Sequence, residues 1–302
     1  MGVDDLHSNN WILKIDIISD VKFMSKVFDD ALQSIIKEID KHNDRTVSYN
    51  HVLRYLKSIK ESFNSVMLLM EHGNSSSAQI LAKSLYESYI QFLFFIIDSA
   101  KLSSKVQCYY NVVAWNYIAD LERKIEINNS SQSIHTEIKP NELEEMRNCG
   151  IEFYEENKFL LLGTSYRKKI DQRSRKGDKH KKIDKWYSIY DSKLNSFYEL
   201  SKTLFKYESK TAWSVVYDNL YSQFSSFSHG FQGYNALISD AGLEESDLGA
   251  IKLLLTLCYF IFDDLIQYLS VFYNDLFNIM DIIDLKALID GQCLMQKYAP
   301  EK

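Results

Sequence analysis

Four side chains of catalytic type recur at helical spacing in two apolar stretches of the chain. Lys83 and Glu87 are four residues apart in a stretch otherwise rich in leucine, tyrosine and phenylalanine. Ser225 and His229 are four apart in a second aromatic stretch. Residues at this spacing share one face of a helix. If the two faces meet, Glu87 and His229 can form a charge-assisted hydrogen bond, and the pattern predicts an acid–base cluster with Lys83 and Ser225 beside it.

The same side chains also have a purely structural interpretation. Long helical bundles often contain polar clamps that are fully hydrogen-bonded and fix the register of neighbouring helices. A clamp needs the two polar faces to meet but needs no substrate. The sequence leaves both interpretations open, and with them the question of whether the protein is an enzyme.

The sequence lacks the motifs that hold cofactors and metals. It has no glycine-rich phosphate loop, no HExxH and no GxSxG motif, and its four cysteines do not follow zinc-ligand spacing. We therefore expect no cofactor and no metal. Scattered cysteines of this kind are typical of reduced thiols in the cytoplasm.

A basic run at residues 167–185 is the strongest charge feature of the chain. Its ten lysines and arginines face three aspartates, so the run carries +7 while the whole chain carries −6. With only Ile170 and Ile183 as apolar residues, the run is expected to lie on the surface or to be mobile. Such a segment on an acidic body would attract nucleic acid or an acidic protein surface. The predicted binding residues are Arg167, Lys168, Lys169, Arg173, Arg175, Lys176, Lys179, Lys181, Lys182 and Trp186.

Aromatic residues border this run. Tyr166 precedes it, and Trp186 and Tyr187 follow it. Rings in such positions could stack on unpaired bases. They could equally anchor the edges of a loop, and the sequence does not decide between the two.

The elements that must position these residues are expected to be long helices. The chain has only 10 glycines and 2 prolines among 302 residues, with 46% apolar residues. A β protein of this size would need many tight turns. We predict an all-α multi-helix bundle with long helices and no βαβ alternation.

The N-terminal region predicts an antiparallel helical hairpin formed by residues 11–40 and a second helix. The second helix has an a/d seam that either packs on the body or joins copies into a homo-oligomer. Its members are Val52, Leu56, Ile59, Phe63, Val66 and Met70. The expected division is a hairpin at residues 1–72 and a main bundle at 73–302, with a basic loop at 163–185.

Two apolar runs in the sequence are candidates for membrane-spanning helices. Residues 89–97 and 253–262 are far shorter than the ~20 apolar residues that a transmembrane helix needs. The first ten residues contain neither the basic nor the apolar region of a secretory signal. We expect a soluble, cytoplasmic protein with no membrane partner.

The two polar stretches also carry a resemblance. AQILAKSLYESYIQFLFFI at residues 78–96, the Lys185–Trp186 pair and YDNLYSQFSSFSHG at 217–230 resemble a widespread bacterial all-helical family of unknown function. Its members share a Leu-x-Arg-Ser-Leu-x-Glu helix and a Tyr-x-x-x-Ser-x-x-x-His helix, and the likeness spans roughly residues 45–270. Carried over residue by residue, Glu87, Tyr221, Ser225 and His229 fit these two motifs. Lys83 stands where the family usually has arginine, so a bidentate role at that position is in doubt.

The chain also resembles, more weakly, the HEPN helical ribonucleases, whose active site is an arginine and a histidine separated by four to six intervening residues. The placements are Arg45–His51, Arg173–His180 and Arg175–His180. His229 has no arginine at this spacing, which departs from the pattern.

The leading hypothesis from the sequence is a cytoplasmic helical interaction module that binds nucleic acid or an acidic protein. Uncharacterised helical proteins of this composition recur in the conflict between bacteria and phages, so a defence or counter-defence role is expected by analogy. The alternative is a metal-independent ribonuclease or toxin that uses Glu87 and His229.

Overall fold

The computed structural model describes residues 3–42, 46–130, 140–155, 164–176, 179–204, 243–274 and 278–297. Across these ranges the regular structure is helical, apart from one ladder of two short strands. The prediction of an all-α bundle with long helices is therefore confirmed.

The chain divides into two compact units. Unit 1 comprises Met1–Ile97 and Leu204–Lys302, and unit 2 comprises Asp98–Thr203. The sequence had suggested a division after residue 72. In the structure the first three helices stay together in unit 1, and the chain leaves that unit only after the third helix.

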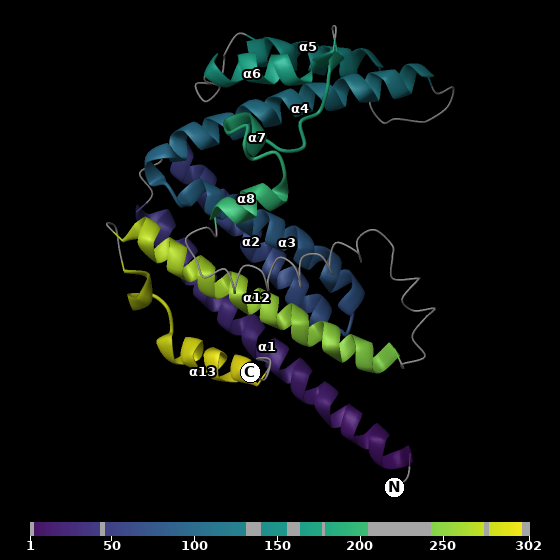
Figure 1. The fold of residues 1–302 in the computed structure, drawn as a ribbon, viewed down its shortest axis with the longest axis vertical. Helices are drawn as coiled ribbons and strands as arrows, with labels where there is room; N and C mark the ends of the chain where they lie inside the picture. Colours follow the sequence, from purple (N-terminus) through teal and green to yellow (C-terminus); the bar gives the residue numbers. More distant parts are fainter. Residues whose placement is uncertain are drawn as a thin grey trace. The chain divides into compact units, whose positions relative to one another are not determined.

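Unit 1 is a bundle of long helices (Figure 1). Its elements are α1 (Val3–His42), α2 (Val47–Glu71), α3 (Ser75–Ile96), α12 (Leu243–Tyr273), η4 (Ile279–Asp281) and α13 (Leu285–Gln296). α2 packs on α1 and α3, while α12 packs on α3 and α1. Two ion pairs give the direction of the first two helices, because Asp40 pairs with Lys57 and the earlier Asp29 pairs with the later Lys60. α1 and α2 therefore run antiparallel.

Caps and a glycine turn explain where these helices begin and end. Thr46 caps α2 by accepting a hydrogen bond from the Tyr49 amide, and Asn74 caps α3 through the Ser77 amide. Between them Gly73 has φ of +69°, the left-handed conformation that favours glycine after a helix. The chain thus reverses in three residues, which places α2 beside α3.

The seam of α2 belongs to the core of unit 1. Its six predicted members are all 0% exposed. Phe63 meets Phe28 of α1 at a centroid distance of 5.6 Å, and Phe28 stacks on Phe262 of α12 at 4.4 Å. The seam packs within its own chain, against α1 and α3, so of the two expected roles the structure has packing on the body.

Unit 2 is built along one helix, α4 (Leu102–Ser130), which follows η1 (Ser99–Lys101). The other elements are α5 (Pro140–Glu155), α6 (Thr164–Ser174), β1 (Arg175–Lys176), β2 (Lys179–His180), α7 (Tyr187–Tyr190) and α8 (Phe197–Leu204), whose last residue falls in unit 1. α5, α6, β2 and α7 each contact α4 (Figure 1). Trp115 is fully buried in unit 2, and its ring meets the Tyr154 ring of α5 edge-on, with a centroid distance of 5.4 Å.

Among the described residues, no single helix has the length and apolar character to cross a membrane. By length and composition alone, α3 and the helix that follows it reach the criterion together as a bent pair.

Candidate nucleic-acid interface

The basic run is attached to α4 through its main chain. The Trp115 indole Nε1 donates to the Lys181 carbonyl at 2.8 Å. The Asn116 side chain binds both polar groups of Ile183, accepting from its amide and donating to its carbonyl, each at 2.8 Å. An asparagine side-chain amide has both N–H donors and an acceptor oxygen, so it can satisfy the amide and the carbonyl of one residue together. These bonds hold residues 181–183 along α4.

Glu122 holds the preceding residue in the same way. Its Oε2 accepts from the His180 amide and its Oε1 accepts from His180 Nδ1, both at 2.8 Å. Arg147 of α5 donates to Oε1 through Nε at 3.1 Å and Nη2 at 2.9 Å. Burial alone would raise the pKa of the Glu122 carboxyl, but the bonds from His180 and Arg147 outweigh it and hold the pKa below its ordinary value. Glu122 is thus an ionised anchor that joins α4, α5 and β2.

The two apolar residues of the basic run complete the attachment. Ile170 is 0% exposed and Ile183 is 9% exposed. The run was expected to be part of a loop that lies on the surface or is mobile. Instead it contains α6 and a ladder in which Arg175 pairs with His180 and Lys176 with Lys179. The prediction failed because polar side chains of α4 satisfy the backbone of a segment that has too few apolar residues to form a core.

Several cations of the run bind neutral oxygens and so keep their charge uncompensated. Arg173 Nη1 donates to the Ser188 carbonyl at 2.8 Å, and Arg167 Nη1 donates to the Glu155 carbonyl at 2.7 Å. Lys185 Nζ donates to the Asn195 carbonyl at 3.2 Å. Lys182, by contrast, pairs with the Asp120 carboxylate at 2.8 Å. The structure therefore orders the run through bonds in which these three cations meet neutral oxygens and only Lys182 meets a carboxylate.

The nine predicted cationic binding residues divide into three groups. Five are exposed at the surface of unit 2, namely Lys168, Lys169, Arg173, Lys181 and Lys182. Arg167 is half-buried, with its guanidinium 5.5 Å from the centre of the Tyr154 ring. The side chains of Arg175, Lys176 and Lys179 lie outside the described part of the structure.

The bordering aromatic residues are anchors. Tyr166 is 8% exposed, and Trp186 and Tyr187 are each 4% exposed. Trp186 packs edge-on against Tyr109 of α4 at 5.5 Å. These rings are not available to stack on bases, so the interpretation of Trp186 as a binding residue is corrected: it holds the end of the run against α4.

The predicted acid–base cluster is only half described. Lys83 and Glu87 lie half-buried on α3 in unit 1, and both take part in interactions there. Ser225 and His229 lie outside the described residues, as does Tyr221. Whether Glu87 and His229 meet therefore stays a prediction.

The arginine–histidine spacing of the helical ribonucleases does not correspond to a described pair. Arg173 binds Ser188, while His180 binds Glu122. His51 is buried against Phe95 at a ring-centroid distance of 4.6 Å. Arg45 and the side chain of Arg175 lie outside the described residues.

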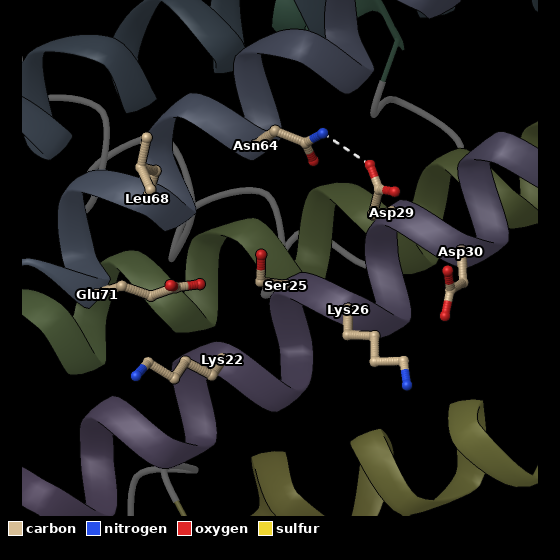
Figure 2. A pocket seen from close by; sticks show the side chains of 8 residues that line it. All are labelled: Lys22, Ser25, Lys26, Asp29, Asp30, Asn64, Leu68 and Glu71. Carbon is tan, nitrogen blue, oxygen red and sulfur yellow. Dashed lines mark hydrogen bonds between the residues drawn. The ribbon is translucent and has the colours of Figure 1, made fainter.

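A groove of about 510 Å³ lies between α1 and α2 in unit 1 (Figure 2). Its lining residues are Lys22, Ser25, Lys26, Asp29, Asp30, Asn64, Leu68 and Glu71. Figure 2 shows Asn64 of α2 bridging to Asp29 of α1, a hydrogen bond of 2.7 Å. Lysines and carboxylates are mixed along this groove, so its lining favours neither an anion nor a cation.

Four residues of the attachment were not singled out from the sequence: Trp115, Asn116, Glu122 and Arg147. Trp115 and Asn116 carried a weak signal, since a large ring beside a polar amide in an apolar stretch suggests a buried contact. Glu122 had none, because it precedes Arg123 and Lys124 and resembles an ordinary surface residue.

The helical units and the attached basic run define an all-α protein whose charged face is fixed by one central helix. The chain belongs to a family of unknown function (DUF5677), whose profile matches residues 49–246. The resemblance to an all-helical family of unknown function is thereby confirmed, over a somewhat shorter span than the sequence suggested. No curated protein and no solved structure matches the chain.

Proposed function

We propose that unit 2 binds nucleic acid through the phosphate backbone, using the exposed cations of residues 167–185. The observation that carries this proposal is the main-chain attachment of residues 180–183 to α4. Pre-ordered lysines lose less conformational freedom on binding than lysines of a mobile loop. Because the backbone is held and the described cations Lys168, Lys169, Arg173 and Lys181 are exposed, the run can present a fixed set of phosphate contacts.

The mode of recognition follows from which groups are exposed. Lysine and arginine contacts to phosphates position a nucleic acid without reading its sequence. The bordering rings Tyr166, Trp186 and Tyr187 are buried and cannot stack on bases. We therefore expect sequence-independent binding whose affinity falls steeply with salt.

The test is a binding titration of a fluorescent 20-base-pair DNA or RNA duplex at several salt concentrations. The variant Lys168→Glu/Lys181→Glu reverses two exposed cations of the run. The matched control Lys22→Glu/Lys26→Glu makes the same change in net charge on exposed lysines of unit 1. Loss of two phosphate contacts should reduce the slope of log K against log salt by about 1.8. The control should keep the wild-type slope.

Equal weakening by both variants would show that only net charge matters and would contradict a site in unit 2. An acidic protein surface would meet the same lysines, so a polyglutamate competitor separates the two partners. If polyglutamate displaces the duplex only at a far higher concentration of charge than unlabelled DNA needs, the result supports nucleic acid as the partner.

A further inference from the structure

The basic run follows α4 in one direction, and this direction determines which part of the helix lies beyond the attachment. Asn116 binds the main chain of Ile183, whereas Glu122, further along α4, binds the earlier residue His180. Positions in the run therefore fall as positions on α4 rise, so the two segments are antiparallel. The part of α4 that follows Glu122 continues the surface to which the run is attached.

Two cations stand at this place. Arg123 and Lys124 directly follow Glu122, and both are exposed. Arg123 is seven residues after Asn116, and Lys124 is four residues after Asp120, so each shares a helix face with the earlier residue. Asn116 and Asp120 both bind the run. The two cations therefore lie on the side of α4 that carries the run.

The nearby carboxylates of α4 are already engaged. Asp120 pairs with Lys182 at 2.8 Å, and Glu122 is held within the attachment. The next carboxylate of the helix, at position 126, takes part in an interaction as well. Within the described ranges of the chain, neither Arg123 nor Lys124 forms an ion pair. Their charges can therefore be used to bind a polyanion.

The positions of these cations suit the repeat of a nucleic-acid backbone. An α-helix rises 1.5 Å per residue, so Lys124 is about 6 Å beyond Asp120 along the axis. Phosphates of one strand follow each other every ~3.4 Å along a duplex axis. Arginine can bind two phosphate oxygens at once and lysine acts as a compact charge. Because both side chains stand on a regular helix, their backbone is ordered before any partner binds.

We propose that Arg123 and Lys124 extend the phosphate-binding surface of unit 2 from the basic run onto α4. This inference rests on the nucleic-acid binding proposed above, and it adds a second element to the site. A phosphodiester backbone lying along α4 would then meet exposed cations of the run, such as Lys181, and the two cations of the helix. Contacts of this kind position a nucleic acid without reading its sequence.

The test repeats the titration of the fluorescent 20-base-pair duplex with Arg123→Gln/Lys124→Gln, which removes two cations without adding repulsion. The slope of log K against log salt should fall by about 1.8 relative to wild type. Combined with Lys168→Glu/Lys181→Glu, the two losses should add to about 3.6.

Two controls separate charge at this site from other effects. Lys22→Gln/Lys26→Gln removes the same charge from exposed residues of unit 1 and should keep the wild-type slope. The exchange Arg123→Lys/Lys124→Arg keeps both charges and should also keep it.

An unchanged slope in Arg123→Gln/Lys124→Gln, with a reduced slope in Lys168→Glu/Lys181→Glu, overturns this inference and leaves the function proposed for the run intact. The opposite result overturns the shared surface, because it places the nucleic acid on α4 alone. A lower slope in the exchange that keeps both charges also overturns the inference, since phosphate contacts would then not explain the loss. If wild type binds no duplex, the inference and the proposed function fail together.

Discussion

At the scale of single residues, His51 shows how burial alone changes the behaviour of a titratable group. It is 5% exposed on α2, and its ring meets Tyr55 and Phe95 edge-on. Burial, reinforced by the nearby Arg54, lowers the pKa of His51 to about 4. The folded protein therefore keeps this imidazole neutral where an unfolded chain would protonate it.

The consequence is a loss of stability in mild acid. Because the unfolded state binds the proton more tightly, the free energy of unfolding should fall as pH drops from about 6.5 toward 4. The total loss from this group should approach about 3 kcal/mol. Urea denaturation at a series of pH values measures it, and His51→Gln should flatten the curve in this range. A variant whose curve follows that of wild type would show that other groups dominate.

Glu122 illustrates what the sequence could not reveal at this scale. Its partner His180 is 58 positions away in the chain, and the two residues that follow Glu122 are charged and exposed. Helical spacing identifies which side chains share a face, but it contains no information on which distant segment covers that face. The pairing of Glu87 with His229 was inferred from spacing in the same way and stays a prediction.

At the scale of elements, the attachment of residues 180–183 rests largely on Asn116. Its side chain satisfies both the amide and the carbonyl of Ile183. Asn116→Ala would leave both groups without that partner at a nearly buried position, which costs about 1–3 kcal/mol locally. We expect the Ile183 amide to exchange hydrogen much faster in this variant.

The same substitution should weaken nucleic-acid binding although Asn116 is not a predicted contact. Hydrogen exchange and the duplex titration together test this, and Asn129→Ala, an exposed asparagine of the same helix, is the control. Faster exchange with unchanged affinity would show that order in the basic run does not contribute to binding.

Helices were predictable and the basic run was not, for a physical reason. The α2 seam repeats apolar residues over nearly three heptads, and every member is buried as the pattern indicates. The basic run has two apolar residues in nineteen, so apolar patterning predicts a loop. Its order comes from side-chain to main-chain hydrogen bonds, which depend on a tertiary partner and have no periodic signal.

At the scale of the whole molecule, the position of the α2 seam determines how a leucine-to-alanine substitution within it should affect stability. Leu56 is 0% exposed within unit 1, whereas Leu68 on the same helix is 56% exposed. Leu56→Ala should lower the free energy of unfolding by about 2–5 kcal/mol, while Leu68→Ala should change it little. Neither variant should alter the molar mass measured by sedimentation equilibrium.

A change of oligomeric state in Leu56→Ala but not in Leu68→Ala would contradict this position, because it would place the seam between copies.

The division into units could not be read from the sequence in the same way. The chain leaves unit 1 after Ile97 and re-enters it at Leu204. Unit 2 is thus an insertion within unit 1 in the sequence, and its second junction falls inside α8.

The attachment of the basic run uses main-chain atoms of Lys181 and Ile183, so the identity of the Lys181 side chain does not enter it. In such a scaffold the main-chain atoms attach the segment to α4, while the exposed side chains remain available to contact a partner. Exposed residues such as those at positions 168 and 181 can therefore be substituted without disturbing the hydrogen bonds to α4. The same scaffold with acidic side chains at those positions would display a fixed anionic surface, suited to a cationic partner.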